Sequence, residues 1–259
     1  MNILLTNDDG YDAEGIRILR QILKTEHNVY VMAPHKNRSA VSSSITMKGY
    51  LEIHRKEDGV WACSGTPVDC VIAALRSGII EQKIDVVISG INAGANLGTD
   101  IIYSGTCAAA RQGVLYGIPS IAVSEDKGDR DKYDFRNLAN FIKDNLEKLV
   151  DLCSAAECVN AGNRLPWNPV CFVNVNGKSV DGYKGVVLCK FHGARNYNDT
   201  ALVTSDDEEN RVIIKGGRLE SFGNSQSDCF VVEEGKIALS LVLAEPYCIN
   251  TVDLSGFSL

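Results

Sequence analysis

Two adjacent carboxylates, Asp8 and Asp9, lie near the start of the chain and are followed by Gly10. Neighbouring side chains on an extended segment point to opposite sides, but a tight turn at Gly10 can bring both carboxylates round one ion. Paired anionic oxygens suit hard cations, so Mg²⁺ or Mn²⁺ is the expected metal, with Ca²⁺ or Co²⁺ as alternatives. The competing interpretation is that Asp8 caps the helix that follows, a common role for aspartate.

A second polar segment, residues 34–44, is rich in hydroxyl groups and includes Arg38, Ser39, Ser42 and Ser43. Hydroxyls and backbone N–H groups can bind phosphate oxygens, and an arginine adds two charged donors. The alternative for the serines alone is a solvated turn. This segment is therefore a candidate phosphate loop.

A third segment, Ser89–Asp100, is rich in glycine and holds Asn92 and Asn96. Glycine lets a ligand approach the backbone closely, and an asparagine offers an oxygen to a metal or an amide donor to phosphate. The spacing is not the GxGxxG pattern of dinucleotide-binding proteins, which should follow the first strand. A plain glycine-rich turn is the alternative.

The tripeptide Ser104-Gly105-Thr106 begins a predicted helix of small residues, 104–116. The first turn of a helix presents free N–H groups and the positive end of the helix dipole, which together attract anions. The alternative is an ordinary serine or threonine cap.

The elements around these segments alternate between strands and helices. Apolar runs predict strands at residues 2–6, 29–33, 85–89 and 120–124, and helical spacing predicts helices at 15–23, 66–77, 104–116 and 133–152. This βαβ order predicts an α/β fold with a doubly wound, parallel-rich sheet. Ligands of such sheets bind outside the carboxyl ends of the strands, so the three polar loops that follow strands should meet at one edge.

The second half of the chain changes character after about residue 160. Residues 170–175, 184–190 and 209–215 are predicted to be extended, with an acidic turn at 205–207, and two short β-like runs are predicted within 229–243. We therefore expect a catalytic core over residues 1–160. Residues 161–259 should be a β-rich part that completes the core and mediates oligomerisation.

The composition excludes several classes of protein. The formal net charge is −7, which argues against a nucleic-acid-binding surface. No apolar run approaches the length of a transmembrane helix, and the first residues do not resemble a signal peptide, so we expect no membrane partner and a cytoplasmic location. The nine cysteines are odd in number and scattered, as expected of free thiols.

Taken in order, five motifs resemble the SurE family of survival proteins and nucleoside monophosphate phosphatases. They are NDDG at 7–10, APHKNRSA at 33–40, GTPVDC at 65–70, SGINAGANLGTD at 89–100 and YSGT at 103–106. The resemblance is close over roughly residues 1–125. It continues more weakly at 172–176 and 184–188 and returns at 227–242, whereas residues 189–197 hold fewer arginines than that family tends to have.

The resemblance implies a Rossmann-like three-layer sandwich with a C-terminal β-hairpin extension, which often swaps between subunits of a homodimer or homotetramer. It also implies hydrolysis of nucleoside 5′- and 3′-monophosphates and, for some members, short polyphosphate. Carried over by motif, the metal ligands would be Asp8, Asp9, Ser39 and Asn92. The residues expected to line the phosphate site are Asn96, Ser104, Gly105 and Thr106, joined by Ser42 and Ser43.

Asp8 and Asp9 are thus the expected catalytic residues, with Asp8 either the base for a water molecule or the nucleophile. Three other functions stay open at this point. A haloacid-dehalogenase-type phosphatase would need two aspartates separated by one residue. A non-catalytic nucleotide- or metal-binding module could use the same sheet, and a transferase would need a domain for its second substrate.

Overall fold

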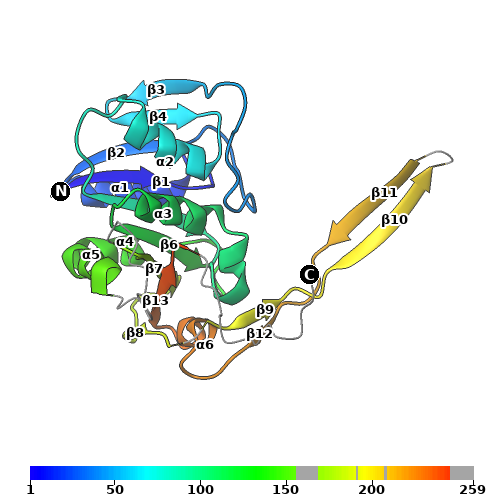
Figure 1. The fold of residues 1–259 in the computed structure, drawn as a ribbon. Helices are drawn as coiled ribbons and strands as arrows, with labels where there is room; N and C mark the ends of the chain where they lie inside the picture. Colours follow the sequence, from blue (N-terminus) through cyan, green and yellow to red (C-terminus); the bar gives the residue numbers. More distant parts are fainter. Residues whose placement is uncertain (156–168, 191, 207–208, 246–259) are drawn as a thin grey trace, which may run out of the picture.

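A nine-stranded sheet forms the centre of the computed structural model, which describes residues 1–155, 169–190, 192–206 and 209–245 (Figure 1). The strands of this sheet are β1 (Asn2–Thr6), β2 (Asn28–Pro34), β3 (Ile53–Glu57), β4 (Val60–Cys63), β5 (Val86–Ala93), β6 (Ser120–Asp126), β7 (Cys171–Lys178), β8 (Val186–Leu188) and β13 (Ile237–Leu243). Their spatial order is β3-β4-β2-β1-β5-β6-β7-β13-β8. The six strands from β4 to β7 run parallel, whereas β3 and β13 pair antiparallel with β4 and β7.

The order of the parallel strands reverses between β1 and β5. From β1 the chain moves outward through β2 to β4, and from β5 it moves the other way through β6 to β7. At such a switch point the loops leave neighbouring strands in opposite directions and open a crevice for ligands. The loop after β1 begins at Asn7, and the end of β5 holds Asn92.

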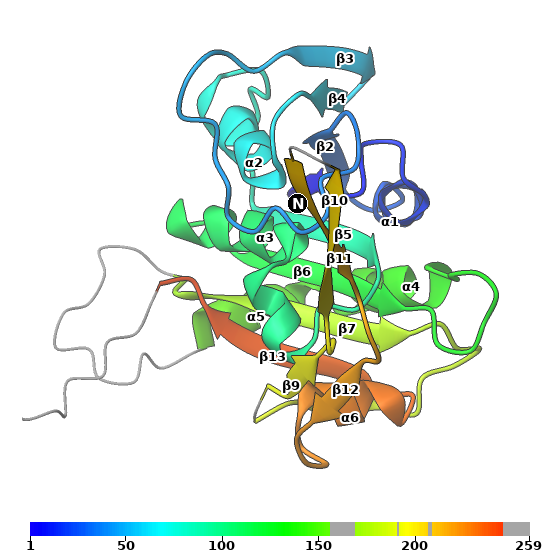
Figure 2. The same cartoon turned by 90° about the vertical axis from the view of Figure 1, so that its right-hand side faces the viewer.

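Helices cover both faces of the sheet. They are α1 (Glu14–Leu23), α2 (Pro67–Arg76), α3 (Gly105–Leu115), α4 (Arg136–Asp144), α5 (Leu146–Ala155) and α6 (Asp228–Glu233), with the 3₁₀ helix η1 (Gly98–Ile102) before α3. The apolar residues of α1, α4 and α5 form one core with one face of the sheet, and those of α2 and α3 pack on the other face (Figure 2). These three layers confirm the predicted α/β Rossmann-like sandwich.

Two predictions about helices and strands are wrong. The single helix expected at residues 133–152 is two helices, α4 and α5, because Asn145 ends the first with φ −123° and its side chain donates to Phe141 O at 3.0 Å. Asparagine competes for backbone hydrogen bonds in this way and is a weak helix former. The first of the two β-like runs expected within 229–243 is the helix α6. Its apolar residues are too few for the run to show a helical period.

Other differences concern elements that the sequence pattern did not reveal. The β3–β4 hairpin lies at an edge of the sheet. Strand β3 is largely exposed and lacks an apolar run, and the buried apolar run of β4 is only four residues long. The strand expected to end at Ser89 continues to Ala93, with an irregular register between Ser89 and Asn92. That extension carries Asn92 to the edge of the sheet.

A two-stranded arm projects from the body of the protein (Figure 1). Its strands β10 (Thr200–Asp206) and β11 (Glu209–Lys215) pair antiparallel, and the short pair β9 (Ala194–Asn196) and β12 (Glu220–Phe222) joins the arm to the body. This arm confirms the predicted β-hairpin extension. The acidic turn expected at 205–207 differs, because Ser205 and Asp206 belong to β10 and Asp207 lies outside the described residues.

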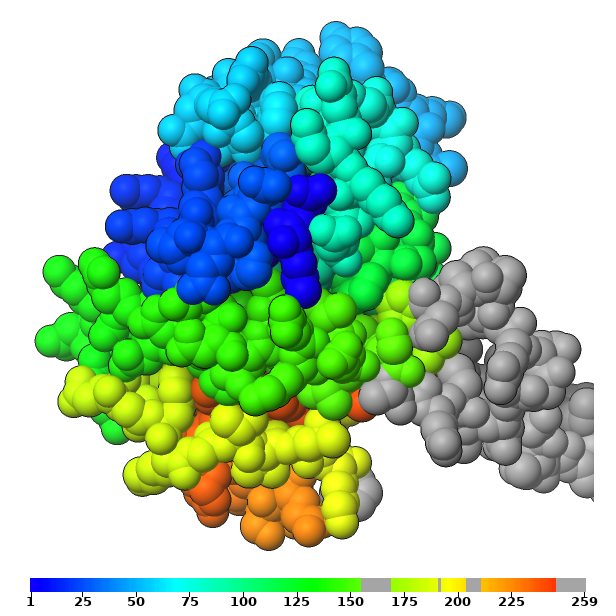
Figure 3. All heavy atoms as spheres, turned by 90° about the vertical axis from the view of Figure 1, so that its left-hand side faces the viewer, coloured from blue at the N-terminus to red at the C-terminus, as the bar shows by residue number. Residues whose placement is uncertain are grey.

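Figure 3 shows the end of the sheet opposite the polar loops, where the N-terminal residues reach the surface. Among the cysteines that the structure describes, Cys63, Cys70, Cys107, Cys153, Cys189 and Cys229 are free thiols. Within the described ranges, no helix combines the length and apolar character that crossing a membrane requires.

Candidate active site

Asp8 lies at the carboxyl end of β1 and is almost fully buried, with 4% of its surface exposed. The Thr106 hydroxyl donates a hydrogen bond of 2.8 Å to Asp8 Oδ1. Burial raises the pKa of the Asp8 carboxyl to about 6. The hydrogen bond from Thr106 opposes that rise, and the like charge of Asp9 adds to it. Asp8 therefore sits against the first turn of α3, whose N–H groups and dipole stabilise a negative charge.

Asp8 does not cap the helix that follows it in sequence. The residue before α1 is Ala13, and no side chain caps this helix end. Gly105 belongs to the first turn of α3, and a Cβ atom there would stand 3.0 Å from both Cβ and Oδ2 of Asp8. A helix distant in sequence thus packs directly on the Asp8 side chain, and the cap interpretation for α1 is wrong.

Asp9 turns toward the end of β5. The backbone N–H of Ala93 donates to Asp9 Oδ2 at 3.1 Å, and Asn37 Nδ2 lies 3.5 Å from Asp9 Oδ1. Burial is the main cause of a raised pKa for Asp9, and the hydrogen bond from Ala93 opposes it. Because Ala93 follows Asn92 directly, the loop after β1 and the end of β5 meet at this carboxylate.

Asn92 and Ser39 lie beside this meeting point. The Asn92 amide nitrogen donates to Gly94 O at 2.7 Å, which leaves its amide oxygen available to another ligand. Asn37 accepts a hydrogen bond from the backbone N–H of Ser39 at 2.8 Å, and the same side chain reaches Asp9. Sequence analysis did not single out Asn37, although it lies within one of the five motifs.

The loop that carries Ser39 has an unusual backbone. Ala40 and Ser42 have φ angles of 58° and 52°, a left-handed conformation that costs energy for residues other than glycine. The Ser42 hydroxyl donates to Ile102 O at 2.8 Å, and its N–H donates to Tyr103 O at 3.1 Å. These bonds hold the loop against the segment that leads into α3. Strain of this kind clusters at functional sites.

Several expected phosphate ligands have partners inside the protein. The Ser104 hydroxyl caps α3 by accepting from the N–H of Cys107 at 3.0 Å, and the Thr106 hydroxyl is directed to Asp8. The side-chain amide of Asn96 donates to the Ser124 hydroxyl at 2.7 Å, and Asn96 is buried. These side chains position the site, and the backbone of Thr106 at the start of α3 adds a hydrogen bond to the Asp8 carboxylate.

Ser43 and the basic residues occupy the rim of the site. Arg111 Nη1 lies 3.4 Å from the Ser43 hydroxyl, which links the loop to α3. Arg38 donates from Nη2 to Ser64 O at 2.6 Å, and its backbone N–H donates to Asp8 O at 2.7 Å. Arg38 thus joins the loop after β1 to the loop after β4.

The motif at 65–70 has a structural role. Thr66 and Asp69 form a capping box at the start of α2, in which Asp69 accepts from the Thr66 N–H at 2.9 Å. Asp69 also accepts from the backbone N–H and the hydroxyl of Thr46, at 2.9 and 2.7 Å. This buried carboxylate therefore anchors the far end of the serine-rich loop.

The donor set at Asp8 and Asp9 fits a hard divalent cation. Neither carboxylate forms an ion pair with any described lysine, arginine or histidine, although Asp8 is buried and Asp9 is half-buried. Two such charges side by side are costly unless a cation offsets them. The part of the chain that the structure describes holds no cluster of three or more His, Cys, Asp or Glu suited to a metal. A metal here would thus use two carboxylates with neutral oxygens.

Comparison with known proteins agrees with this geometry. Residues 3–198 match the family described as Survival protein SurE. The 5′-nucleotidase SurE of Treponema pallidum is 49% identical over 171 residues, which are 63% of this chain and 90% of that protein. The 5′-nucleotidase SurE of Clostridium botulinum (strain Alaska E43 / Type E3) is 37% identical over 246 residues, 93% of this chain and 92% of that protein.

A solved structure is similar over nearly the whole chain. The crystal structure of the SurE protein from Aquifex aeolicus superposes with a TM-score of 0.74 at 31% sequence identity, covering 95% of this chain and 94% of that one. The match spans both the sheet and the C-terminal extension. Together with the motifs and the fold, these similarities show that the chain belongs to the SurE family.

Proposed function

We propose that this protein is a metal-dependent 5′-nucleotidase of the cytoplasm, which hydrolyses nucleoside monophosphates to nucleoside and phosphate. The observation that carries the proposal is the buried Asp8 beside the half-buried Asp9, a pair that lies at the switch point of the sheet without a basic partner among the described residues. Relatives that align with nearly the whole chain are named 5′-nucleotidases. Nucleoside 3′-monophosphates and short-chain polyphosphate belong to the proposed substrate range.

Asp8, Asp9, Ser39 and Asn92 would hold the metal, with two carboxylates, one hydroxyl and one amide oxygen. A bound divalent ion would offset charge on the phosphoryl oxygens and lower the pKa of a water molecule. Asp8 would act as the base for the attacking water, or as the nucleophile, while Thr106 fixes its orientation through Oδ1. The N–H groups at the start of α3, from Gly105 onward, would bind phosphate oxygens.

The side chains around these groups would shape the phosphate site. Ser104 and Asn96 would keep α3 and the end of the glycine-rich loop in place, through the helix cap and the bond to Ser124. Ser42 and Ser43 would present their loop to the phosphate, since both are tied to the segment around α3. These are roles of orientation, which lower the entropy cost of reaching the transition state.

Phosphate release from a panel of compounds tests the proposal directly. We expect turnover of nucleoside 5′-monophosphates with Mg²⁺ or Mn²⁺ and loss of turnover when a chelator removes the metal. Readdition of the metal should restore the rate, which separates metal loss from unfolding. Tight nucleotide binding without phosphate release would support a non-catalytic module instead, and turnover unaffected by the chelator would exclude a required metal.

Replacing Thr106 tests how strongly the site depends on the orientation of Asp8. A hydrogen bond to a charged group contributes about 1.5–3 kcal/mol. Thr106→Val keeps the shape of the side chain and removes that bond, so we expect kcat/KM for AMP to fall roughly 10- to 100-fold. Thr106→Ser keeps the hydroxyl and should retain most activity. Equal rates for the valine and serine variants would show that the hydroxyl is not used.

We further propose that residues 161–259 complete the core and that the arm joins copies of this chain into a homodimer or homotetramer. Strands β7 and β13 belong to the central sheet, whereas the β10–β11 arm has no extensive contact with another helix or strand that the structure describes. Val203 and Ile214 on one face of the arm are 65% and 75% exposed, and Leu202 on the other face is 46% exposed. A projecting apolar hairpin of this kind needs a partner to cover it.

Charged residues on the arm should therefore change the assembly. We expect the double variant Val203→Asp/Ile214→Asp to sediment as a smaller species than the unmodified protein at equal concentration. A double variant on the body, Lys83→Asp/Lys148→Asp, provides the control, because both lysines are exposed and distant in sequence from the arm. An unchanged sedimentation coefficient for the arm variant would exclude the arm as the interface.

A further inference from the structure

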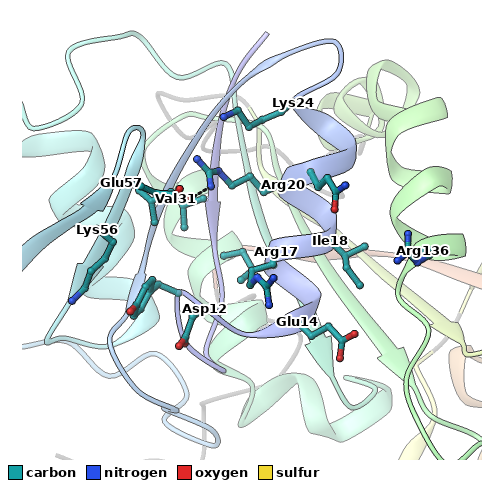
Figure 4. Close-up of a pocket in the computed structure, with 14 residues that line it drawn as sticks. Asp12, Glu14, Arg17, Ile18, Arg20, Lys24, Val31, Lys56, Glu57 and Arg136 are labelled. Atoms are coloured by element: carbon teal, nitrogen blue, oxygen red, sulfur yellow. Dashed lines mark hydrogen bonds and ion pairs between the residues drawn. The ribbon is translucent and has the colours of Figure 1, made fainter.

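A groove of about 880 Å³ lies beside α1, away from the predicted metal ligands. Its walls come from α1, from the β3–β4 hairpin and from the start of α4 at Arg136 (Figure 4). Val31 and Val60 contribute an apolar floor. None of Asp8, Asp9, Ser39, Asn92 and the residues of α3 lines it, so this groove is a separate feature of the surface.

The charge of the groove is opposite to that of the whole protein. Five of its lining side chains are basic and three are acidic, in a chain whose formal net charge is −7. The basic ones are Arg17, Arg20, Lys24, Lys56 and Arg136, and the acidic ones are Asp12, Glu14 and Glu57. A local excess of positive charge in an acidic protein concentrates anions at that place.

Basic residues on α1 and at its C-terminal cap form a row. Arg17, Arg20 and Lys24 are three and four residues apart, which places them on one face of the helix. With a rise of 1.5 Å per residue, the row is roughly 10 Å long. Figure 4 shows these three side chains following one another along the helix. A row of this length can contact several linked anionic groups at once, whereas a single phosphate would contact only part of it.

One member of the row is held in place and the others are available. Arg20 forms an ion pair with Glu57 and donates from Nη2 to Asp58 O at 3.0 Å, which joins α1 to the β3–β4 hairpin. Arg17, Lys24 and the facing residues Lys56 and Arg136 have no ion pair within the described parts of the chain. Lys56 lies over the ring of Tyr11, with Nζ 5.4 Å from its centre. The groove thus has a fixed wall and four cations free to bind a ligand.

We propose that this groove binds a chain of linked phosphates, such as inorganic tripolyphosphate or the triphosphate of a nucleoside triphosphate. Such a chain carries three or four negative charges along a length close to that of the row on α1, and Arg17 and Lys24 can bind its two ends. Lys56 and Arg136 add positive charge from the facing walls. Asp12 and Glu14 lie on the same groove and make extended polyanions less favourable than a short chain.

Binding measured by calorimetry in a chelator tests this site apart from the metal site. Without a metal, the carboxylates of the metal site repel phosphate, which disfavours binding at that site. We expect tripolyphosphate to bind the unmodified protein. The charge-reversal variant Arg17→Glu/Lys24→Glu should weaken that binding at least 10-fold, and Arg17→Gln/Lys24→Gln should weaken it less. Absence of binding to the unmodified protein up to millimolar tripolyphosphate would overturn the proposal.

A matched variant distinguishes binding in the groove from a general effect of the protein's net charge. Lys83→Glu/Lys148→Glu changes the net charge by the same amount at exposed residues outside the groove and should bind like the unmodified protein. If both charge-reversal variants weaken binding equally, the groove is not the site. Comparison with ATP identifies the source of the ligand. Equal affinity for ATP and tripolyphosphate indicates that only the phosphate chain is recognised, and tighter binding of ATP indicates that the nucleoside contributes contacts.

The test of tripolyphosphate binding in the groove can fail or succeed independently of the proposed hydrolysis of AMP at the metal site. Arg17→Glu/Lys24→Glu should hydrolyse AMP at the rate of the unmodified protein when no polyphosphate is present, because none of the predicted metal ligands lines the groove. Asp8→Asn should bind tripolyphosphate normally in the chelator. Loss of tripolyphosphate binding in Asp8→Asn would place the ligand at the metal site and overturn the groove proposal.

Discussion

Asp8→Asn is expected to lower phosphate release from AMP by roughly 10²- to 10⁴-fold at saturating Mn²⁺ or Mg²⁺, the range of a lost catalytic base. The substitution removes a charge that the proposed metal and the proposed chemistry both require. The fold should persist, because an asparagine oxygen can still accept the 2.8 Å hydrogen bond from the Thr106 hydroxyl. Removal of a buried carboxylate without a basic partner among the described residues should even leave the melting temperature unchanged or higher.

The control for this experiment is Asp151→Asn, which removes a carboxylate from an exposed position on α5. It should leave phosphate release within twofold of the unmodified protein. Near-full turnover of AMP or p-nitrophenyl phosphate by Asp8→Asn, with metal added back, would exclude Asp8 as base, nucleophile and essential ligand. Detection of a phosphorylated aspartate in the unmodified protein would instead assign Asp8 as the nucleophile.

Gly15→Ala is expected to destabilise the protein by about 3 kcal/mol, although the same change inside most helices is stabilising. Gly15 lies in the first turn of α1, and a Cβ atom there would stand 2.0 Å from the backbone oxygen of Ile91. That oxygen belongs to β5 and cannot move without shifting the strand that carries Asn92 and Ala93. We therefore expect a lower melting temperature, by roughly 6–12 °C, together with weaker catalysis.

Gly182→Ala is the matched control, because no atom lies within 4 Å of the added Cβ and the backbone there has no positive φ. Its melting temperature should stay within about 2 °C of the unmodified protein. If Gly15→Ala had the same melting temperature as Gly182→Ala, α1 could move away from β5 with little loss of stability. The close contact with the backbone oxygen of Ile91 would then not be the reason for a glycine at residue 15.

The predicted elements that proved right share one property, a clear local pattern. Strand β1 is buried on both faces, so Ile3, Leu4 and Leu5 form a continuous apolar run. Helix α1 has a regular apolar stripe at Ile16, Leu19 and Leu23. The edge strand β3 and the short helix α6 lack such patterns, because an exposed strand needs no apolar residues and six residues are too few to show a period.

The candidate site divides in the same way. That Asp8 and Asp9 lie in the loop directly after the first buried strand is readable from the sequence. The rule that carboxyl ends of parallel strands share one edge brings them near Asn92 and the start of α3. The direction of each side chain is not readable, because it depends on hydrogen bonds to residues far along the chain. Asn96, for example, bonds to Ser124, and its backbone oxygen accepts from Asn174 at 2.9 Å.

The sequence by itself determined the α/β class, the order of the polar loops and the pair Asp8-Asp9, because apolar runs and loop residues are local properties of a chain. Only the tertiary structure decided that Asp8 packs against α3. The Thr106 hydroxyl, 98 residues further along the chain, donates a hydrogen bond to Asp8 there. The tertiary structure also decided that the basic face of α1 meets the β3–β4 hairpin in a groove. The physical reason is that burial, close packing and hydrogen bonding join residues by distance in space, which sequence separation does not reveal.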